Sequence, residues 1–158
     1  MTRLLLRLAY QLYRLHWLVL RPVTLGVRLI LISDETGIEQ VVLVRHTYQP
    51  GWHLPGGAIH RGERPDQAAM REGVEEAGAH LLEPPRLLGV HSSFEYGQSN
   101  HVLTFVSRSF RLERPTDRWE IADRAAFPLD DLPADVTAGT RRRIEEYRAG
   151  EWPLLGRW

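Results

Sequence analysis

The segment GAIHRGERPDQAAMREGVEEAGA, which runs from Gly57 to Ala79, is the part of this chain that most restricts its fold. Its second half predicts a helix over about Pro65–Ala77, because proline is tolerated in a first helical turn and a glycine follows the last residue. Residues three and four apart share one helix face, so Glu72 lies beside both Glu75 and Glu76. Three carboxylates on one face repel one another unless they point to solvent or a cation neutralises them.

The glutamate cluster has two interpretations. In the first it is a charged helix face pointing to water, as most charge runs are. In the second it binds a hard divalent cation, Mg²⁺ or Mn²⁺, which takes carboxylate oxygens and substrate phosphates as ligands. Glu72 and Glu76, one turn apart, are then paired ligands, and Glu75 is a third. The carbonyl of Gly56 or Gly57 adds another, because glycine lets the backbone approach closely.

The spacing around these glutamates resembles the sequence box of the Nudix (MutT-like) family. The box combines glycine, glutamate and arginine at fixed intervals, and this chain supplies Gly57, Glu63, Arg71, Glu72, Glu75, Glu76 and Gly78 at those intervals. Gly73 and Ala79 depart from it, because the family has bulky apolar residues there. Both departures concern packing under the helix and not chemistry. The resemblance extends from about Thr24 to about Pro133.

The resemblance implies an α/β fold in which a mixed β-sheet is sandwiched between helices. It also implies a metal-dependent hydrolase, in which water attacks phosphorus and cleaves the diphosphate linkage of a nucleoside diphosphate joined to another moiety. A Nudix-fold sensor module that binds its ligand without hydrolysis is the alternative, but such proteins commonly lose box glutamates and this chain keeps them. An isoprenyl-diphosphate isomerase on the same fold is disfavoured, because that chemistry uses a cysteine and the chain has none.

Arg71 and Glu63 are expected to support the metal ligands. A guanidinium beside a metal would oppose the cation, so Arg71 should face away from it. A pair with Glu63 would then fasten the glycine loop to the helix. A solvent-exposed ion pair that contributes little is the alternative.

Proton abstraction from the attacking water requires a carboxylate, either a box glutamate such as Glu75 or Glu76 or one from a distant loop. Relatives often place a glutamate shortly before a segment such as FPLDDLP, residues 127–133 here. The resemblance therefore makes Glu120 the leading candidate base and Asp123 the second. A surface-facing carboxylate is the alternative for either.

Basic and aromatic residues are the candidates for binding the substrate. Arg45 lies with His46 just before the glycine turn, where both are placed to meet phosphates. The rings of Trp52 and Tyr96 are candidates for stacking on a base, because every nucleobase has a π face. Ordinary core or rim aromatics are the alternative, and the sequence does not choose among nucleotide substrates.

Composition limits the remaining possibilities. The 158 residues carry a formal net charge of zero, so stable nucleic-acid binding is not expected. The absence of cysteine excludes disulfides, thiolate metal sites and a cysteine nucleophile, and it fits a cytoplasmic protein. The length suits one domain, which we assign to residues 22–158, preceded by a helix within residues 1–21.

Residues 3–20 predict a basic amphipathic helix, in which Arg3, Arg7 and Arg14 form one stripe and leucines cover most of the remainder. The regular arginines argue against a membrane span, and no small-residue cleavage site follows. The apolar arc is too wide to be left in water. We therefore expect it to pack on the domain, on a second subunit in a homodimer, or on an anionic membrane surface.

Apolar and β-branched runs predict the strands of the sheet. Two of them form a hairpin, and a terminal helix follows the last strand. The expected strands are Val23–Ile32, Gln40–Arg45, Arg86–Phe94, Val102–Leu112 and a short one over Trp119–Phe127, and the expected terminal helix is Thr137–Ala149.

Overall fold

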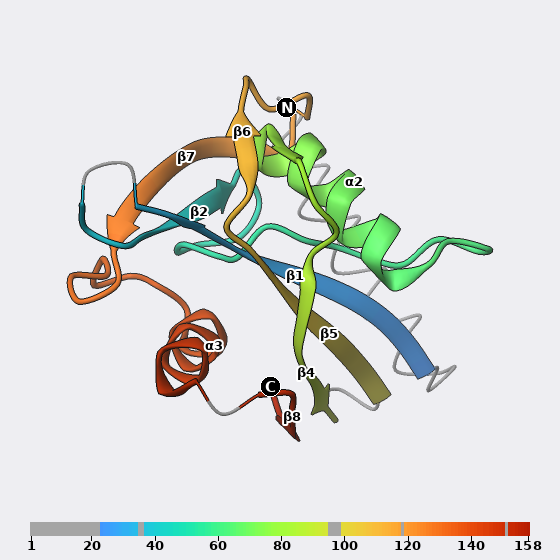
Figure 1. Ribbon diagram of the computed structural model, residues 1–158. Coiled ribbons are helices and arrows are strands. Elements are labelled where there is room, and N and C mark those ends of the chain that lie inside the picture. Colours follow the sequence, from blue (N-terminus) through green and yellow to red (C-terminus); the bar gives the residue numbers. More distant parts are fainter. Residues whose placement is uncertain (1–22, 35–36, 95–98, 118, 151) are drawn as a thin grey trace.

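The computed structural model describes residues 23–34, 37–94, 99–117, 119–150 and 152–158. In chain order the elements are β1 (Val23–Ser33), β2 (Gln40–His46), α2 (Pro65–Ala77), β3 (Ala79–Leu81), β4 (Arg86–Ser93), β5 (Ser99–Ser107), β6 (Phe110–Leu112), β7 (Ile121–Pro128), α3 (Ala138–Ala149) and β8 (Leu154–Arg157). Six strands form one mixed sheet, and α2 and α3 lie on its opposite faces (Figure 1). The expected α/β sandwich is confirmed. The N-terminal helix and the domain boundary expected before residue 22 lie outside the described residues.

The order of strands in the large sheet is β7-β2-β1-β5-β4-β8, and β3 pairs with β6 in a separate two-stranded sheet. β1 runs parallel to β5 along most of its length. β1 and β2 form the expected antiparallel hairpin, but they pair only at Ile32 with Val41 and at Ser33 with Gln40. Beyond these two pairs the central strands diverge and leave a gap between them.

The segment 53–59 fills this gap. On one side, Val44 of β2 exchanges two backbone hydrogen bonds with His53, with N–O distances of 3.0 and 2.9 Å. On the other side, the amides of Val27 and Leu29 in β1 donate to carbonyls of the segment at 2.8 and 2.9 Å. The glycine turn is therefore hydrogen-bonded to both central strands.

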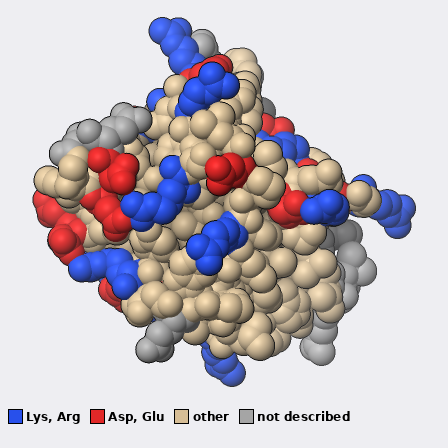
Figure 2. Space-filling model, in the orientation of Figure 1, with Lys and Arg blue, Asp and Glu red and all other residues tan. Residues whose placement is uncertain are grey.

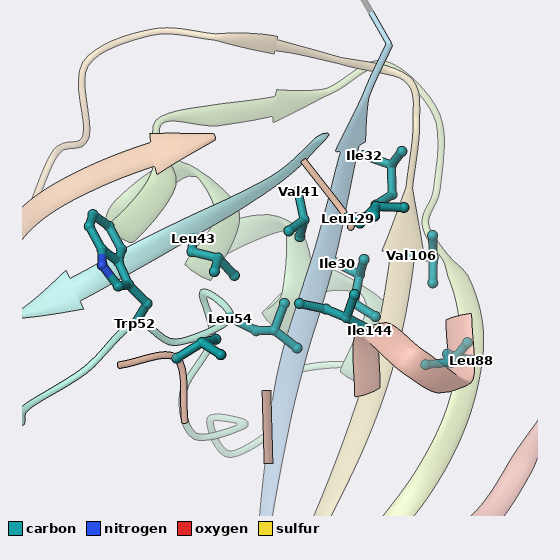
Figure 3. Close-up of a cluster of buried hydrophobic side chains, with 11 residues drawn as sticks. Ile30, Ile32, Val41, Leu43, Trp52, Leu54, Leu88, Val106, Leu129 and Ile144 are labelled. Atoms are coloured by element: carbon teal, nitrogen blue, oxygen red, sulfur yellow. The ribbon is translucent and has the colours of Figure 1, made fainter. Parts of the chain in front are cut away.

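Side chains along β1 alternate between the two faces of the sheet, and this alternation builds two hydrophobic cores. Odd-numbered residues such as Leu29 join a cluster that contains Ala68 of α2. Even-numbered residues such as Ile30 join a second cluster, drawn in Figure 3. This cluster contains Leu54 from the segment 53–59 and Ile144 from α3. Each helix therefore buries its apolar side against one face of β1 and β2.

α2 spans Pro65–Ala77, the bounds expected from the sequence. Gly78 ends it with φ of 62°, and its amide donates to the carbonyl of Val74 at 3.0 Å. A Cβ at Gly73 would lie 3.0 Å from Leu29 Cδ2. The departure from the box at Gly73 is thus explained by a leucine of β1 that occupies the space beneath the helix.

The strand expected over residues 102–112 is divided in two. β5 begins earlier, at Ser99, and ends at Ser107, after which β6 pairs with β3. The Ser109 amide donates to Ser107 Oγ at 3.3 Å, so a local turn separates the two strands. β3 and β8 were not expected from the sequence, because three and four residues are too few for a periodic pattern.

Acidic and basic side chains are interspersed over the face of the molecule drawn in Figure 2. Some of the described arginines pair with acidic side chains from other elements, as Arg45 does with Asp135 and Arg108 with Glu39. None of the helices in the described part of the chain is both long and apolar enough to cross a membrane.

Candidate active site

Two of the three neighbouring glutamates on α2 are buried against the sheet. Glu72 and Glu76 are 8% and 6% exposed, whereas the side chain of Glu75 is 43% exposed. Buried carboxylates require hydrogen bonds, an opposite charge or a metal. The interpretation as a solvated helix face is therefore wrong for Glu72 and Glu76.

The glycine turn brings backbone groups against both buried carboxylates. The Gly56 amide donates to Glu76 Oε2 at 2.8 Å. Gly56 has φ of 144°, and a Cβ there would lie 2.2 Å from the carbonyl oxygen of Val27. A Cβ at Gly57 would lie 2.5 Å from Glu72 Oε1. Glycine is required at position 56 by the backbone of β1, whereas a side chain at position 57 would displace the Glu72 carboxylate.

The carbonyls of the two glycines already accept hydrogen bonds. The Val27 amide donates to Gly57 at 2.8 Å, and Arg28 Nη1 donates to Gly56. A carbonyl oxygen has two lone pairs, so each can make one further contact. The sequence did not identify Arg28, which fixes the turn from β1.

Arg71 is hydrogen-bonded to three glutamates. Its Nε and Nη2 donate to the two oxygens of Glu63 at 2.8 and 3.1 Å, which is the expected ion pair. Its Nη1 also donates to Glu72 at 2.8 Å and to Glu75 at 2.9 Å. The guanidinium therefore contacts two of the expected metal ligands, whereas the sequence predicted that it would face away. Its remaining bond, from Nη2 to the carbonyl of Ala58 at 3.0 Å, fastens the helix to the glycine loop.

Arg71 occupies the space beside two of the carboxylates that the sequence assigns to a metal. Within the described residues, no group of three or more histidine, aspartate or glutamate side chains is arranged to hold a metal. The guanidinium supplies the positive charge beside Glu72 and Glu75 instead. It also lowers the pKa of Glu63 to about 2, through their hydrogen bonds.

The chemistry of the donors nevertheless fits a hard cation. The pKa of Glu76 is raised to about 7, chiefly by burial and further by the charges of Glu72 and Glu120, although the Gly56 amide and Arg28 oppose the rise. A bound cation would favour ionisation of such a carboxyl and relieve the repulsion among its neighbours.

A loop before β7 directs Glu120 toward the same carboxylates. Asp117 Oδ1 accepts the Glu120 amide at 3.0 Å, and the Thr47 amide donates to the Glu120 carbonyl at 2.8 Å. Partial burial and the charges of Asp117, Glu72 and Glu75 raise the pKa of Glu120, and a hydrogen bond from Tyr48 opposes the rise. The electrostatic coupling indicates that Glu120 lies near the helix carboxylates.

Asp123, the second candidate base, has different surroundings. It is exposed, and its Oδ1 accepts the amide of the adjacent Arg124 at 2.8 Å. This contact belongs to the backbone of β7, and no hydrogen bond or ion pair among the described residues joins Asp123 to the α2 glutamates.

Comparison with known proteins identifies the family. The family described as "NUDIX domain" matches residues 22–147, most of the chain. The chain belongs to the Nudix family. It is a Nudix hydrolase, an enzyme of the class that hydrolyses pyrophosphate bonds.

Individual relatives agree with this assignment. A Bacillus subtilis (strain 168) protein named "Putative 8-oxo-dGTP diphosphatase" is 26% identical over 127 residues, which cover 80% of this chain and 81% of that protein. A second B. subtilis protein, "Putative ADP-ribose pyrophosphatase YjhB", is 32% identical over 98 residues, 60% of this chain but only 47% of that protein. The crystal structure of a MutT NUDIX hydrolase from Burkholderia pseudomallei superposes with a TM-score of 0.68 at 27% identity, covering 78% of this chain and 97% of that one.

His46 is a residue of this Nudix site for which the sequence suggested only phosphate contact. Its side chain is 4% exposed, and its Nδ1 lies 3.7 Å from Glu76 Oε1. Burial, followed by the charges of His53 and Arg28, lowers the pKa of His46 to about 4. The signal in the sequence is a histidine at the end of a strand that directly precedes the glycine turn.

Trp52 and Arg45 are not located as expected for substrate contacts in this Nudix domain. Trp52 is 6% exposed and packs edge-on against Phe127 in the core between the sheet and α3, so its ring is unavailable for stacking on a base. Arg45 lies over the Trp52 ring at 4.7 Å and pairs with Asp135 at 2.7 Å. These contacts hold Arg45 away from the buried glutamates. Tyr96 lies outside the described residues.

Proposed function

We propose that this Nudix hydrolase requires Mg²⁺ or Mn²⁺ and cleaves the diphosphate linkage of a nucleoside diphosphate joined to another moiety, by attack of water on phosphorus. The observation that carries the proposal is the burial of Glu72 and Glu76 against a turn in which the backbone leaves no room for a side chain at Gly56. The names of two relatives, which refer to 8-oxo-dGTP and ADP-ribose, support a nucleotide substrate.

Glu72, Glu75 and Glu76 would hold the cation, with the carbonyl of Gly57 as a further ligand. A cation bound there would neutralise phosphate oxygens and lower the pKa of a bound water. The bidentate bond from Arg71 to Glu63 would keep the glycine loop attached to α2 with Glu72 and Glu75 engaged by a cation.

Glu120 would accept the proton of the attacking water. Its raised pKa supports this role, because a base is most effective when its pKa lies near the working pH. The backbone contacts with Asp117 and Thr47 hold the loop in position before the substrate binds. Glu75 and Glu76 are the alternative bases within the box.

A groove of about 500 Å³ beside Gly57 offers space for part of the substrate. It is lined by the first residues of β1, by the loop that follows Gly57, and by Asn100 and Val102 of β5. The mixture of apolar and amide groups suits a nucleoside.

We further propose a cytoplasmic location, which the absence of cysteine supports.

The test is a substrate panel with the full-length protein. It contains ADP-ribose, dinucleoside polyphosphates, nucleotide sugars, and (d)NTPs with their oxidised forms, each with Mg²⁺, Mn²⁺ or EDTA. We expect release of a phosphorylated product from at least one compound with either cation and none with EDTA. In H₂¹⁸O the label should enter a phosphate of the product.

A protein that binds ADP-ribose tightly yet cleaves no compound with either cation would contradict the proposal and support the sensor alternative. Cleavage that continues in EDTA would contradict the metal requirement alone. For a variant such as Glu76→Gln, the exposed Glu145 of α3 provides a matched control. Glu145→Gln also removes one carboxylate charge, but far from the site.

A further inference from the structure

The imidazole of His46 is a buried group of the site that the proposed hydrolysis does not use. Its Nδ1 lies 3.7 Å from Glu76 Oε1, which is too far for a hydrogen bond. Among the described residues this nitrogen has no hydrogen-bond partner. Because buried polar atoms are almost always paired, an unpaired ring nitrogen aimed at a carboxylate indicates a place for a ligand.

The ring of His46 is held in a fixed frame. The ring centroids of Tyr48 and His53 each lie 5.2 Å from its own, at interplanar angles of 36° and 64°. The main chain is fixed as well, because His46 is the last residue of β2 and pairs with Ile121 of β7. These contacts keep Nδ1 directed at Glu76.

Glu76 is the box glutamate that Arg71 does not reach among the hydrogen bonds of the described residues. Arg71 donates to Glu72 and Glu75, while Glu76 Oε2 accepts the amide of Gly56. The other oxygen, Oε1, faces His46. One oxygen from α2 and one nitrogen from the end of β2 thus face each other with no hydrogen bond between them.

We propose that His46 Nδ1 is a ligand of the metal site together with Glu76, and that it shifts the preference of the site from Mg²⁺ toward Mn²⁺. The proposal rests on the metal dependence proposed above, and it adds a residue that lies outside the Nudix box. Mg²⁺ prefers oxygen ligands and near-ideal octahedral geometry. Imidazole nitrogen suits transition metals better, and their affinity for a given site rises along the series that begins with Mn²⁺.

The direct test is the electron spin echo envelope modulation of Mn²⁺ bound to the full-length protein without substrate, which detects a nitrogen nucleus bonded to the metal. We expect the modulation of a bound imidazole in the wild type, and its loss in His46→Phe, which keeps a ring against Tyr48 and His53. His53→Phe is the matched control. It replaces an imidazole whose ring centroid lies 5.2 Å from that of His46 and whose Nε2 already lies 3.1 Å from the Pro50 carbonyl oxygen, and it should keep the signal.

Calorimetric titration with MnCl₂ and with MgCl₂ gives a second measurement. In His46→Phe the Kd for Mn²⁺ should rise by about 10-fold or more, since even outer-shell partners of a metal contribute that much, and the Kd for Mg²⁺ should change much less. His46→Leu, which is smaller, should behave in the same way and guards against misfolding of the Phe variant. Circular dichroism checks the fold of both.

The possible results separate the two proposals. Imidazole modulation that persists in both His46 variants, or equal weakening of Mn²⁺ and Mg²⁺, would overturn the role of His46 and leave the metal dependence intact. A wild-type protein that binds neither cation, with or without a nucleotide, would overturn both.

Discussion

Opposing interactions act on the pKa of Glu76. Burial and two neighbouring carboxylates raise its pKa, while the Gly56 amide and Arg28 lower it. The conservative change Glu76→Gln keeps the shape of the side chain and removes the charge. It therefore separates the role of this residue in binding a cation from its effect on folding.

For activity, we expect Glu76→Gln to reduce the metal-dependent turnover by at least about 100-fold while the protein stays folded, because a charged metal ligand is lost. Turnover on the best substrate of the panel, measured at saturating Mg²⁺, checks this. Glu145→Gln should retain wild-type activity. If Glu76→Gln keeps wild-type turnover, the assignment of Glu76 to the metal is incorrect.

For stability, the raised pKa of Glu76 predicts a dependence on pH in metal-free protein. The folded state holds the proton up to about pH 7, whereas the unfolded chain releases it near 4.5. The proton on Glu76 therefore stabilises the folded state fully below pH 4.5. This contribution to the free energy of unfolding is lost as the pH rises to about 7, at about 1.4 kcal/mol per pH unit. In EDTA, urea unfolding should find wild type and Glu76→Gln similar at pH 5, and the variant more stable at pH 8. An equal pH dependence in the two proteins would contradict this.

α2 illustrates how a helix adapts to the sheet beneath it. Gly73 lowers the intrinsic helix propensity by about 1 kcal/mol relative to alanine, yet it allows Leu29 of β1 to approach within 3.0 Å of where a Cβ would be. The contact joins the helix that carries the carboxylates to the strand that binds the glycine turn. The side chain of Leu29 on β1 therefore fills the space between α2 and the sheet at Gly73.

We expect Gly73→Ile, which restores a bulky apolar residue, to destabilise the protein by about 1–3 kcal/mol through overpacking. Gly73→Ala should stay within about 1 kcal/mol of wild type, because its better helix propensity offsets the close contact. Urea unfolding of a double-mutant cycle with Leu29→Ala tests the cause. Strictly additive effects of Gly73→Ile and Leu29→Ala would show that the two side chains do not compete for the same space.

The elements that sequence could predict are those with strong local signals. α2 has a proline, a glycine and fixed spacing, and its bounds were correct. β3 and β8 are three and four residues long, and the parallel pairing of β1 with β5 joins residues 76 apart in the chain, such as Val23 and Ser99, so none of these features has a local signal. The box indicated the buried carboxylates, but it could not show that Arg71 also reaches Glu72 and Glu75, or that His46 approaches Glu76.

At the scale of the whole molecule, the segment of residues 1–22 is the largest part whose role is a prediction from the sequence. Its basic amphipathic pattern requires a surface that covers the apolar arc. We expect that surface to be protein, either the Nudix domain or a second subunit. The full chain and a chain that starts at residue 22 should then pellet equally with anionic lipid vesicles. Preferential pelleting of the full chain would assign the segment to the membrane surface, and sedimentation equilibrium distinguishes a dimer from a monomer.

Hydrogen exchange provides a measure of how the glycine turn is joined to the sheet. The amides of Val27 and Leu29 donate to Gly57 and Pro55 of the turn and not to a neighbouring strand. We expect both amides to exchange with D₂O as slowly as the central amides of β5, and more slowly still with Mn²⁺ bound. Rapid exchange at these two amides beside a protected β5 would show that the turn opens separately.

The insertion of the turn between β1 and β2 also limits how this enzyme can evolve. In many enzymes a mobile loop can lose its order while the scaffold remains folded, and mutations then affect activity and abundance independently. Here the turn that faces the carboxylates also completes the central sheet. Substitutions in the core beneath β1 should therefore lower both the amount of folded protein and the catalytic competence of each folded molecule. Selection for turnover and selection for a stable sheet act on the same hydrogen bonds.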